Sequence, residues 1–505
     1  MLSLLAQIDQ PPFVRPDIDW HAVAPELLLL GLGALVTTLD LVFLDRIRKY
    51  MPTITGLAFL IPLIPILTLW NQSEDLPRVM FDGAYVVDRY SLALKILFLL
   101  SGYVVVLLST DYMAEGDYYD SEFYQLISAS VLGMVVMSSA RDLITIFVAL
   151  ELISIPAYLM AAWRKRDLKS NEAGLKYMLM GVFASAIMLY GMSILYGVSG
   201  STKLADIASA DIMSAGTRPI VTLAIVFTVV GFGFKVSAVP FHTWAPDTYE
   251  GAPTPLTAFL AVASKAAGFV ALINVVLVAL PSQSDVVQPL MWVLSAVTMT
   301  VGNLIAIRQT NIIRMLAYSG VAQAGYMLAP LAVYGEQFNE TNPANAIVNY
   351  LLVYAAMNLG AFAVVLLVAR KTRSGEISSY AGLMNYAPGL GAAMTIFLFS
   401  LAGIPPVGGW WAKFQIFNVL TQNTSFFGIS LAVIAAVNSV IAAFYYLNVA
   451  KQMWFMPEPN QDHTPIRMPA PLATALAITV VATIVFGILP GITGDLSDFT
   501  NLAAR

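Results

Sequence analysis

The sequence predicts an all-α, polytopic membrane protein with about 14 transmembrane helices. Hydrophobic residues make up 58% of the 505 positions and charged residues only 11%. The mean hydropathy of +0.75 lies far above that of soluble proteins. About 14 apolar stretches are long enough to cross a hydrocarbon core of roughly 30 Å, which takes about 20 helical residues. Because the links between these stretches are short, we expect no separate soluble domain.

The predicted spans follow one another along nearly the whole chain. Helices are expected throughout because lipid offers no partner to exposed backbone groups. The longest link, from Asn71 to Asp88, is a candidate for a small β-hairpin. The spans fall near residues 23–43, 52–70, 89–109, 122–139, 142–162, 171–198, 217–245, 254–280, 287–306, 312–334, 343–370, 387–420, 426–452 and 470–492.

Basic residues are distributed unequally between the two sets of loops. Loops after odd-numbered spans hold about 14 Lys and Arg, including "DRIRKY", "WRKRDLK" and "ARKTR", against about seven on the other side. By the positive-inside rule the odd-numbered loops face the cytoplasm or its equivalent. With an even number of spans, both termini are expected on the opposite side.

Several kinds of cofactor site are excluded by composition and context. The chain has no cysteine and only three histidines, so it lacks thiolate ligands for iron–sulfur clusters and a cluster of histidines for haem or metal. The glycine pairs in "GLGALV" and "GFGFKV" lie inside predicted spans and not after a strand, which rules out a dinucleotide-binding turn. We therefore expect no cofactor in this chain and no nucleic-acid partner.

Five lysines lie inside predicted spans and more than two residues from their ends. A charge at the centre of a membrane helix costs about 2.5–3.5 kcal/mol even on the lenient insertion scale. Such residues usually face a bundle interior or water and mark ion pathways; the alternative is that the side chain extends to the headgroups. They are Lys95, Lys176, Lys235, Lys265 and Lys413.

Depth in the membrane separates the two explanations. Lys95 and Lys176 lie about six residues, or roughly 9 Å, from the start of a span. We expect Lys95 to reach the interface, and Lys176 fits either explanation. Lys265 lies near the midplane, as does Glu151 in "IFVALELISIPAYL".

The acidic residues Glu26 and Asp40 lie near the ends of the first span. Their positions favour an interfacial or structural role over a place in an ion pathway.

Two over-long spans are interrupted by proline or glycine, and each carries a lysine. Lys235 precedes Pro240, and Lys413 follows the "PPVGG" of "LAGIPPVGGWWAKF". Broken helices expose carbonyls and helix ends at mid-membrane depth, where transporters bind their ions. We interpret the breaks as sites that admit water and polar backbone, with the lysines as proton carriers; simple kinks with structural lysines are the alternative.

The separation of about 178 residues between these lysines suits two repeats of about five helices each. An odd number of helices per repeat makes the two copies inverted. The sequence thus divides into N-terminal helices (1–121), repeat one (122–280), repeat two (281–452) and a C-terminal helix (453–505).

Four stretches carry a resemblance to a known family. They are "FVALELISIPAYLMAAWRKRDLKSNEAGLKYMLMG", "FKVSAVPFHTWAPDTYEGAPTPLTAFLAVASKAAGF", "AYSGVAQAGYMLA" and "PPVGGWWAKF". With these motifs, nearly the whole chain resembles the antiporter-like membrane subunits of respiratory complex I. It is most similar to the N-type subunit (subunit 2), and within that group to the cyanobacterial and chloroplast version of the photosynthetic NDH complex.

The resemblance implies roles for individual residues. The M-type relatives carry glutamate where this chain has Lys413, and the L-type relatives continue into a long lateral helix, so the N-type is favoured. The implied proton relay consists of Glu151, Lys176, Lys235, Lys265, Lys413 and, in "PFHTWAPD", His242, for which a structural contact is equally plausible.

The implied function is proton translocation coupled to quinone reduction, with plastoquinone as the acceptor in the photosynthetic version. Quinone, iron–sulfur clusters and the electron donor belong to other subunits. The implied partners are the M- and L-type and small membrane subunits, lipids and protons, in a thylakoid membrane or alternatively a bacterial plasma membrane. Two rivals remain open: a cation/proton antiporter subunit and a non-conducting scaffold.

Overall fold

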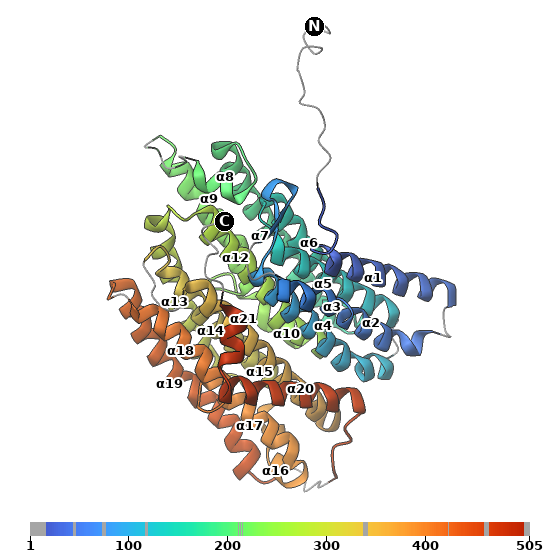
Figure 1. Cartoon of the computed structure of the whole chain (residues 1–505). Helices are drawn as coiled ribbons and strands as arrows, with labels where there is room; N and C mark the ends of the chain where they lie inside the picture. The colour runs from blue at the N-terminus through green and yellow to red at the C-terminus, as the bar shows by residue number, and fades with distance from the viewer. Residues whose placement is uncertain are drawn as a thin grey trace.

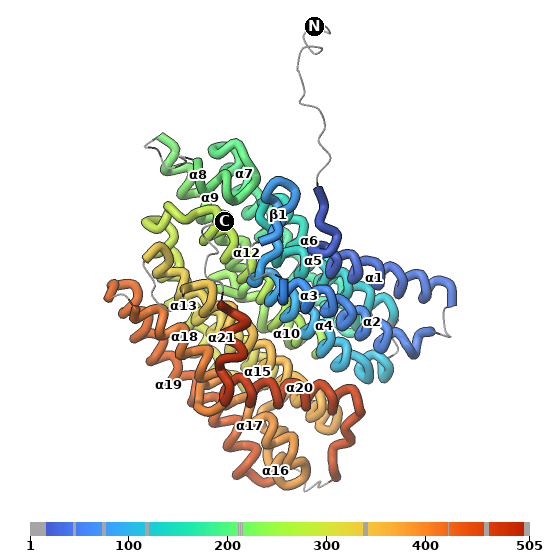
Figure 2. Tube along the Cα trace, viewed as in Figure 1, coloured from blue at the N-terminus to red at the C-terminus, as the bar shows by residue number. Residues whose placement is uncertain are grey.

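The computed structural model describes residues 17–498 except 44–46, 73–76, 117–119, 211, 213, 215, 337–341, 423 and 459–463. Within these residues the chain is a bundle of long helices (Figures 1 and 2). Eleven helical segments are long and apolar enough to cross a membrane. The predicted all-α membrane fold is therefore confirmed.

The eleven long segments coincide with eleven of the predicted spans. They are α1 (Ala24–Phe43), Arg48–Gln72 with α2 (Met51–Leu60) and α3 (Leu63–Gln72), α4 (Arg89–Glu115), α6 (Leu143–Ala161), α7 (Leu168–Ser199), α9 (Arg218–Val236), Thr254–Ala279 with α11 (Thr254–Phe259) and α12 (Lys265–Ile273), α13 (Ser284–Ala306), α15 (Pro343–Thr372), α19 (Phe426–Phe455) and α20 (Ala470–Ile488).

The other three predicted spans fall on shorter, partly described or broken helices. These are α5 (Asp120–Ser139), α14 (Ile312–Leu328) and the pair α17 (Pro388–Ala402) and α18 (Gly408–Gln422). The remaining helical elements are α8 (Leu204–Ser209), α10 (Trp244–Gly251), α16 (Leu383–Tyr386), α21 (Gly491–Ser497), short 3-10 turns at Arg48–Tyr50, Phe81–Gly83, Ala329–Ala332 and Ile377–Tyr380, and π-helical turns at Leu260–Ser264 and Asn274–Ala279.

Side-chain caps fix the start of the helices that later carry the site. The carboxylate of Asp142 accepts hydrogen bonds from the backbone amides of Ile144 and Thr145 at the start of α6. Asn311 caps α14 in the same way. Such caps satisfy amides that have no partner within the helix, so these two residues determine where the helices begin.

The link before α4 forms the expected hairpin. Strand β1 (Arg78–Met80) pairs antiparallel with β2 (Tyr85–Val87), with Met80 opposite Tyr85. Asp82 and Gly83 take positive φ in the connecting turn. The hairpin brings Tyr85 against the first helices, and this position matters for Lys95 below.

Both predicted helix breaks are present. Helix α9 ends where Ser237 takes a left-handed conformation, and α17 ends in the same way at Gly403. The first break is held by Trp244 of α10, whose indole N–H donates to the carbonyl of Phe234 at 3.1 Å. Lys235 lies before its break and Lys413 after its own, so the two lysines do not occupy equivalent places in the predicted repeats.

Helix α15 is the centre of the bundle. Its most apolar window is completely buried, whereas α7 and α19 are about one-third buried. In Figure 1, α1 and α2 lie at one edge, α18 and α19 at the other, and α15 lies between them. The outer helices expose apolar side chains, for example Phe183 of α7 and Val440 of α19. The division of the chain into four parts stays a prediction.

Candidate functional site

Lys235, at the end of α9, is buried and has one hydrogen-bond partner among the described residues. Only 3% of Lys235 is exposed. Its ammonium donates to the hydroxyl oxygen of Ser154 on α6 at 2.7 Å. Ser154 is fully buried, and its hydroxyl donates a hydrogen bond to the carbonyl of Leu150 at 2.6 Å. The hydroxyl oxygen of Ser154 therefore accepts the hydrogen bond from Lys235 through a lone pair, while its own hydrogen is used in the bond to Leu150.

Glu151 lies on the same face of α6, one turn before Ser154. It is half-buried, and its Oε1 is enclosed without a hydrogen-bond partner in the described part of the chain. The carboxylate is close enough to act electrostatically on Lys235, but no ion pair within 4.0 Å joins them. Glu151 and Lys235, both members of the implied relay, thus lie in one site, where the ammonium is hydrogen-bonded to the neutral hydroxyl of Ser154.

Ser154 was not among the site residues predicted from the sequence. The signal was available, because Ser154 follows Glu151 by three residues in an otherwise apolar helix. Residues three apart lie on the same side of an α-helix.

Lys265 begins α12 directly after a π-helical turn, Leu260–Ser264. Such turns occur often at functional sites. The Lys265 ammonium, which is 2% exposed, donates to the backbone carbonyl of Gly320 on α14 at 2.7 Å. A Cβ atom at position 320 would lie 3.1 Å from this nitrogen, so glycine permits the close approach.

A line of buried polar groups leads from Gly320 toward the second helix break. Ser319 contacts the hydroxyl of Tyr446. Gln323, one turn further along α14, donates to the same hydroxyl at 3.3 Å and to the carbonyl of Leu401 at 3.0 Å. The hydroxyl of Tyr350 donates to the other end of the Gln323 amide. These side chains connect the surroundings of Lys265 with the end of α17.

Lys413, in α18, lies at that end. Its ammonium donates to the carbonyl of Ala402, the residue after Leu401, at 2.8 Å, and to Ser439 at 3.5 Å. It also lies 4.7 Å from the centre of the Tyr326 ring. Because α17 stops at Ala402, this carbonyl has no intrahelical partner and belongs to the negative end of the helix dipole. The break thus creates the binding place of the lysine.

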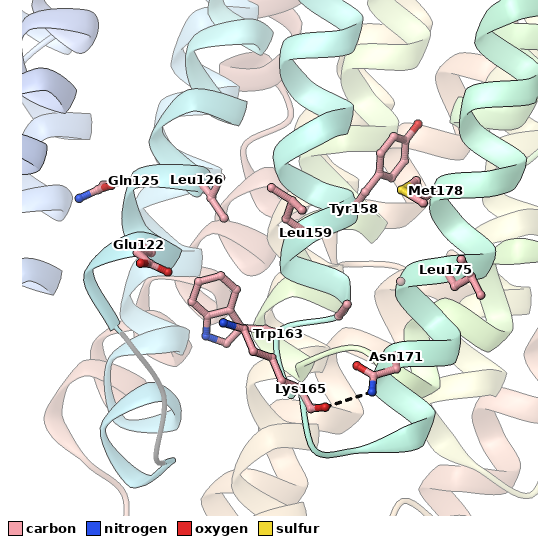
Figure 3. Close-up of a pocket in the computed structure, with 12 residues that line it drawn as sticks. Glu122, Gln125, Leu126, Tyr158, Leu159, Trp163, Lys165, Asn171, Leu175 and Met178 are labelled. Atoms are coloured by element: carbon pink, nitrogen blue, oxygen red, sulfur yellow. Dashed lines mark hydrogen bonds between the residues drawn. The ribbon is translucent and has the colours of Figure 1, made fainter.

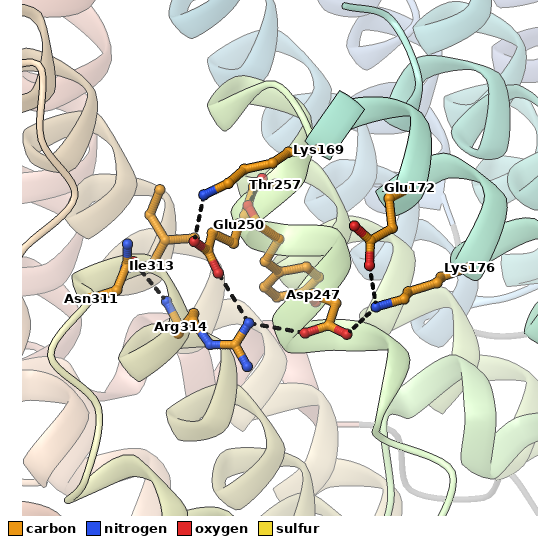
Figure 4. Close-up of polar contacts among 10 residues, drawn as sticks. Lys169, Glu172, Lys176, Asp247, Glu250, Thr257, Asn311, Ile313 and Arg314 are labelled. Carbon is orange, nitrogen blue, oxygen red and sulfur yellow. Dashed lines mark hydrogen bonds and ion pairs between the residues drawn. The ribbon is translucent and has the colours of Figure 1, made fainter. Parts of the chain in front are cut away.

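Lys176 belongs to a different group of charges. Its side chain is 42% exposed and pairs with Glu172 at 2.6 Å and with Asp247 of α10 at 2.7 Å (Figure 4). Arg314 of α14 pairs with Asp247 at 2.9 Å and with Glu250 at 3.0 Å. The cluster therefore ties α10, the half-helix after the first break, to α7 and α14.

Asp247 shows how these charges act on one another. Its partial burial works to raise the pKa of the carboxyl, but hydrogen bonds from Lys176 and Arg314 outweigh burial and hold the pKa below its usual value. The carboxylate is therefore charged at neutral pH and fixed between two cations.

His242 lies in the break between α9 and α10 and is 8% exposed. Its Nδ1 is buried and has no hydrogen-bond partner among the residues described. The ring centre lies 6.3 Å from that of Tyr318. Its role as a bridge in a water chain stays a prediction.

The prediction that Lys95 reaches the membrane interface is wrong. We expected the ammonium to reach the headgroups, but the residue is completely buried and pairs with Glu26 of α1 at 2.6 Å. The hydroxyl of Tyr85 in β2 donates to the same carboxylate oxygen at 2.6 Å. The hairpin covers this end of α4 and closes the route to the interface. Glu26 has the structural role expected of it.

Over the described ranges, no group of three or more His, Asp or Glu side chains is arranged to hold a metal ion.

Residues 140–439 match the family described as NADH:quinone oxidoreductase/Mrp antiporter, TM. The chain is 38% identical over 475 residues to the NADH-quinone oxidoreductase subunit N of Trichlorobacter lovleyi, covering 94% of this chain and 95% of the relative. It is 39% identical over 490 residues to subunit N of Desulforamulus reducens, covering 97% and 99%.

Solved structures agree with this result. A chain of respiratory complex I from Thermus thermophilus superposes with a TM-score of 0.77 at 32% identity, covering 93% of this chain and 98% of that one. A chain of the Mrp complex from a Dietzia species superposes with a TM-score of 0.81 at 20% identity, covering 95% and 96%, which shows a shared fold only. The chain therefore belongs to the NADH:quinone oxidoreductase/Mrp antiporter family of membrane proteins, in which it groups with the N subunits of NADH-quinone oxidoreductase.

Proposed function

We propose that this antiporter-like membrane-arm subunit moves protons through a relay of Glu151, Lys235, Lys265 and Lys413, driven by quinone reduction in a complex I-type enzyme. One observation carries the proposal. The three lysines are buried, and each hydrogen-bonds to neutral oxygens: Ser154, the Gly320 carbonyl, and the Ala402 carbonyl with Ser439. Burial opposes the charged form of a lysine, and none of the three ammonium groups has a carboxylate of the described residues within 4.0 Å. Such a lysine is able to give up its proton.

Lys95 provides the contrast within the same chain. Its ammonium is equally buried but lies 2.6 Å from the carboxylate of Glu26. If the buried lysines only held helices together, we would expect each of them to form an ion pair with a carboxylate, as Lys95 does with Glu26. The neutral partners of the other three lysines therefore favour conduction over the scaffold.

The first step concerns Lys235 and Glu151. When the ammonium turns from Ser154 to the Glu151 carboxylate, the pair holds the proton; when it turns back, burial releases the proton toward Lys265. From there the polar line through Gln323 leads to Lys413 beside Ala402, where exchange with the far side takes place.

The energy for opening the pair comes from other subunits, which hold the cofactors, the quinone and the electron donor. Coupling is then conformational and electrostatic, through contacts along the membrane arm. The M- and L-type and small membrane subunits are the partners we expect there. A cation/proton antiporter remains the second candidate, since the Mrp chain has the same fold.

For localisation we propose an energy-coupling membrane with the basic loops on the cytoplasmic side. The relatives compared come from bacteria such as Trichlorobacter lovleyi and are named as NADH-quinone oxidoreductase subunits. These names favour the plasma membrane and a respiratory quinone over the thylakoid and plastoquinone. The photosynthetic assignment rests on the sequence resemblance alone.

The proposal is tested by measuring proton uptake coupled to quinone reduction in vesicles that contain the assembled complex. Lys235→Met removes the proton-carrying group, and Glu151→Gln removes its charged partner. We expect both variants to assemble and to lose proton uptake. The matched control is Lys451→Met, the same change at an exposed lysine of α19. Unchanged proton uptake in an assembled Lys235→Met complex would contradict the proposal and leave the chain as a scaffold.

A further inference from the structure

A cavity of about 700 Å³ opens between α5, α6 and α7, outside the lysine relay (Figure 3). Its apolar wall takes one or more side chains from each helix: Leu126 from α5, Tyr158 and Leu159 from α6, and Leu175 and Met178 from α7. Leu159 and Leu175 are more than half exposed. The wall therefore faces the hydrocarbon and is suited to an acyl chain.

The rim of the cavity is polar and lies at the basic loop that joins α6 to α7. Lys165 and Glu122 are exposed there and form no ion pair with described residues. The loop is fixed, because the side-chain amide of Asn171 donates to the carbonyl of Lys165 at 3.0 Å. In Figure 3, the Lys165 side chain extends toward Trp163. One cation and one anion thus border the opening.

Trp163 supplies the observation that points to a ligand. Its ring is 8% exposed and packs edge-on against Phe123, with 5.4 Å between ring centres. Its indole N–H is buried in the cavity lining and has no hydrogen-bond partner in the described structure. A buried donor without a partner costs about 1–3 kcal/mol, so such groups are normally satisfied. The Trp163 N–H is therefore available to an acceptor that does not belong to this chain.

We propose that this cavity binds a phospholipid with a primary ammonium headgroup, of the phosphatidylethanolamine type. The lipid phosphate accepts hydrogen bonds from Trp163 and Lys165, and the ammonium pairs with Glu122. One acyl chain lies along Leu126, Leu159 and Leu175. The positive charge of Lys165 and the negative charge of Glu122 at the rim favour a zwitterionic headgroup that carries hydrogen-bond donors.

The size of the cavity argues against a helix of a partner subunit as the occupant. A helix is about 10 Å wide and rises 5.4 Å per turn, so two turns alone fill roughly 850 Å³. The cavity is smaller than this, whereas its volume is within the range of small-molecule sites, about 300–1,000 Å³. The basic loop and Trp163 also suit the headgroup level of the cytoplasmic leaflet.

The test uses the full-length chain in its assembled complex, reconstituted into nanodiscs that contain a photoreactive phosphatidylethanolamine with a diazirine in one acyl chain. We expect cross-links on the peptides that carry Leu159 and Leu175. Trp163→Phe, which keeps the ring and removes only the N–H, is expected to lower this cross-linking about tenfold. Arg166→Gln, in the same loop but outside the cavity lining, is the matched control and is expected to change nothing.

Headgroup selection is tested with Glu122→Gln and a phosphatidylcholine probe. The wild type is expected to prefer phosphatidylethanolamine, and Glu122→Gln is expected to abolish the preference. Equal labelling by both lipids in the wild type would overturn the headgroup assignment. A photoreactive residue placed at Leu159 that cross-links to another polypeptide in place of lipid would overturn the site itself, as would labelling that Trp163→Phe leaves unchanged.

Discussion

The buried pair of Lys95 and Glu26 allows a quantitative prediction about stability. Lys95 is completely buried and the Glu26 side chain is 11% exposed, with 2.6 Å between their charged atoms. Lys95→Met leaves the carboxylate inside the protein without its cation. Removing one partner of a buried pair costs about 3–5 kcal/mol. Because Tyr85 still donates to Glu26, we expect the lower end, about 3 kcal/mol of unfolding free energy.

The assay is equilibrium denaturation of the purified complex in mixed micelles, with the loss of helical signal as readout. The double variant Glu26→Gln with Lys95→Met removes both charges, and since replacing a whole buried pair is often nearly neutral, it is expected to recover most of the loss. Lys451→Met serves again as the exposed control. The reasoning fails if Lys95→Met stays within about 1 kcal/mol of wild type, or if the double variant is as unstable as the single one.

Two further predictions concern the charge cluster and the second break. Lys176 and Arg314 lower the folded-state pKa of Asp247. The carboxylate therefore stabilises the fold fully above the ordinary carboxyl pKa of about 3.9, and this stabilisation is lost as the pH falls through the lowered value. In denaturation experiments from pH 6 to 3, Asp247→Asn is expected to lack this pH-dependent loss of unfolding free energy. Gly409→Ala places a Cβ against the carbonyl of Ser400 and is expected to cost about 1–3 kcal/mol in thermal unfolding, whereas Gly389→Ala, with open space around it, is expected to cost far less.

The membrane fold could be predicted because hydropathy and helix length follow directly from the bilayer. All 14 predicted spans correspond to described helices, and both breaks lie at the predicted proline- and glycine-containing segments. Depth along a span also identified Lys265 as buried. These properties depend on local sequence, since lipid leaves the backbone few alternatives.

The partners of the buried charges could not be predicted in the same way. Lys95 lies as close to its helix end as an interfacial lysine, but it is buried against Glu26 of α1 and Tyr85 of the hairpin. The acceptors at Gly320 and Ala402 are backbone carbonyls, which every residue has, so the residue type does not identify them as lysine partners. Such contacts depend on how distant helices pack, and a single sequence does not contain that information.

The neighbourhood of Lys235 also sets how the proposed relay can move. Ser154 and Glu151 are three residues apart on one helix, a rise of about 4.5 Å, which a lysine side chain can bridge by rotating its own torsions. The ammonium can therefore exchange a neutral acceptor for a charged one while both helices stay in place. Torsional rearrangements are fast compared with the microsecond-to-millisecond motions of helices. In the proposed relay, the rotation of the Lys235 side chain is therefore not the slowest step. The turnover rate is then determined by slower steps elsewhere in the complex.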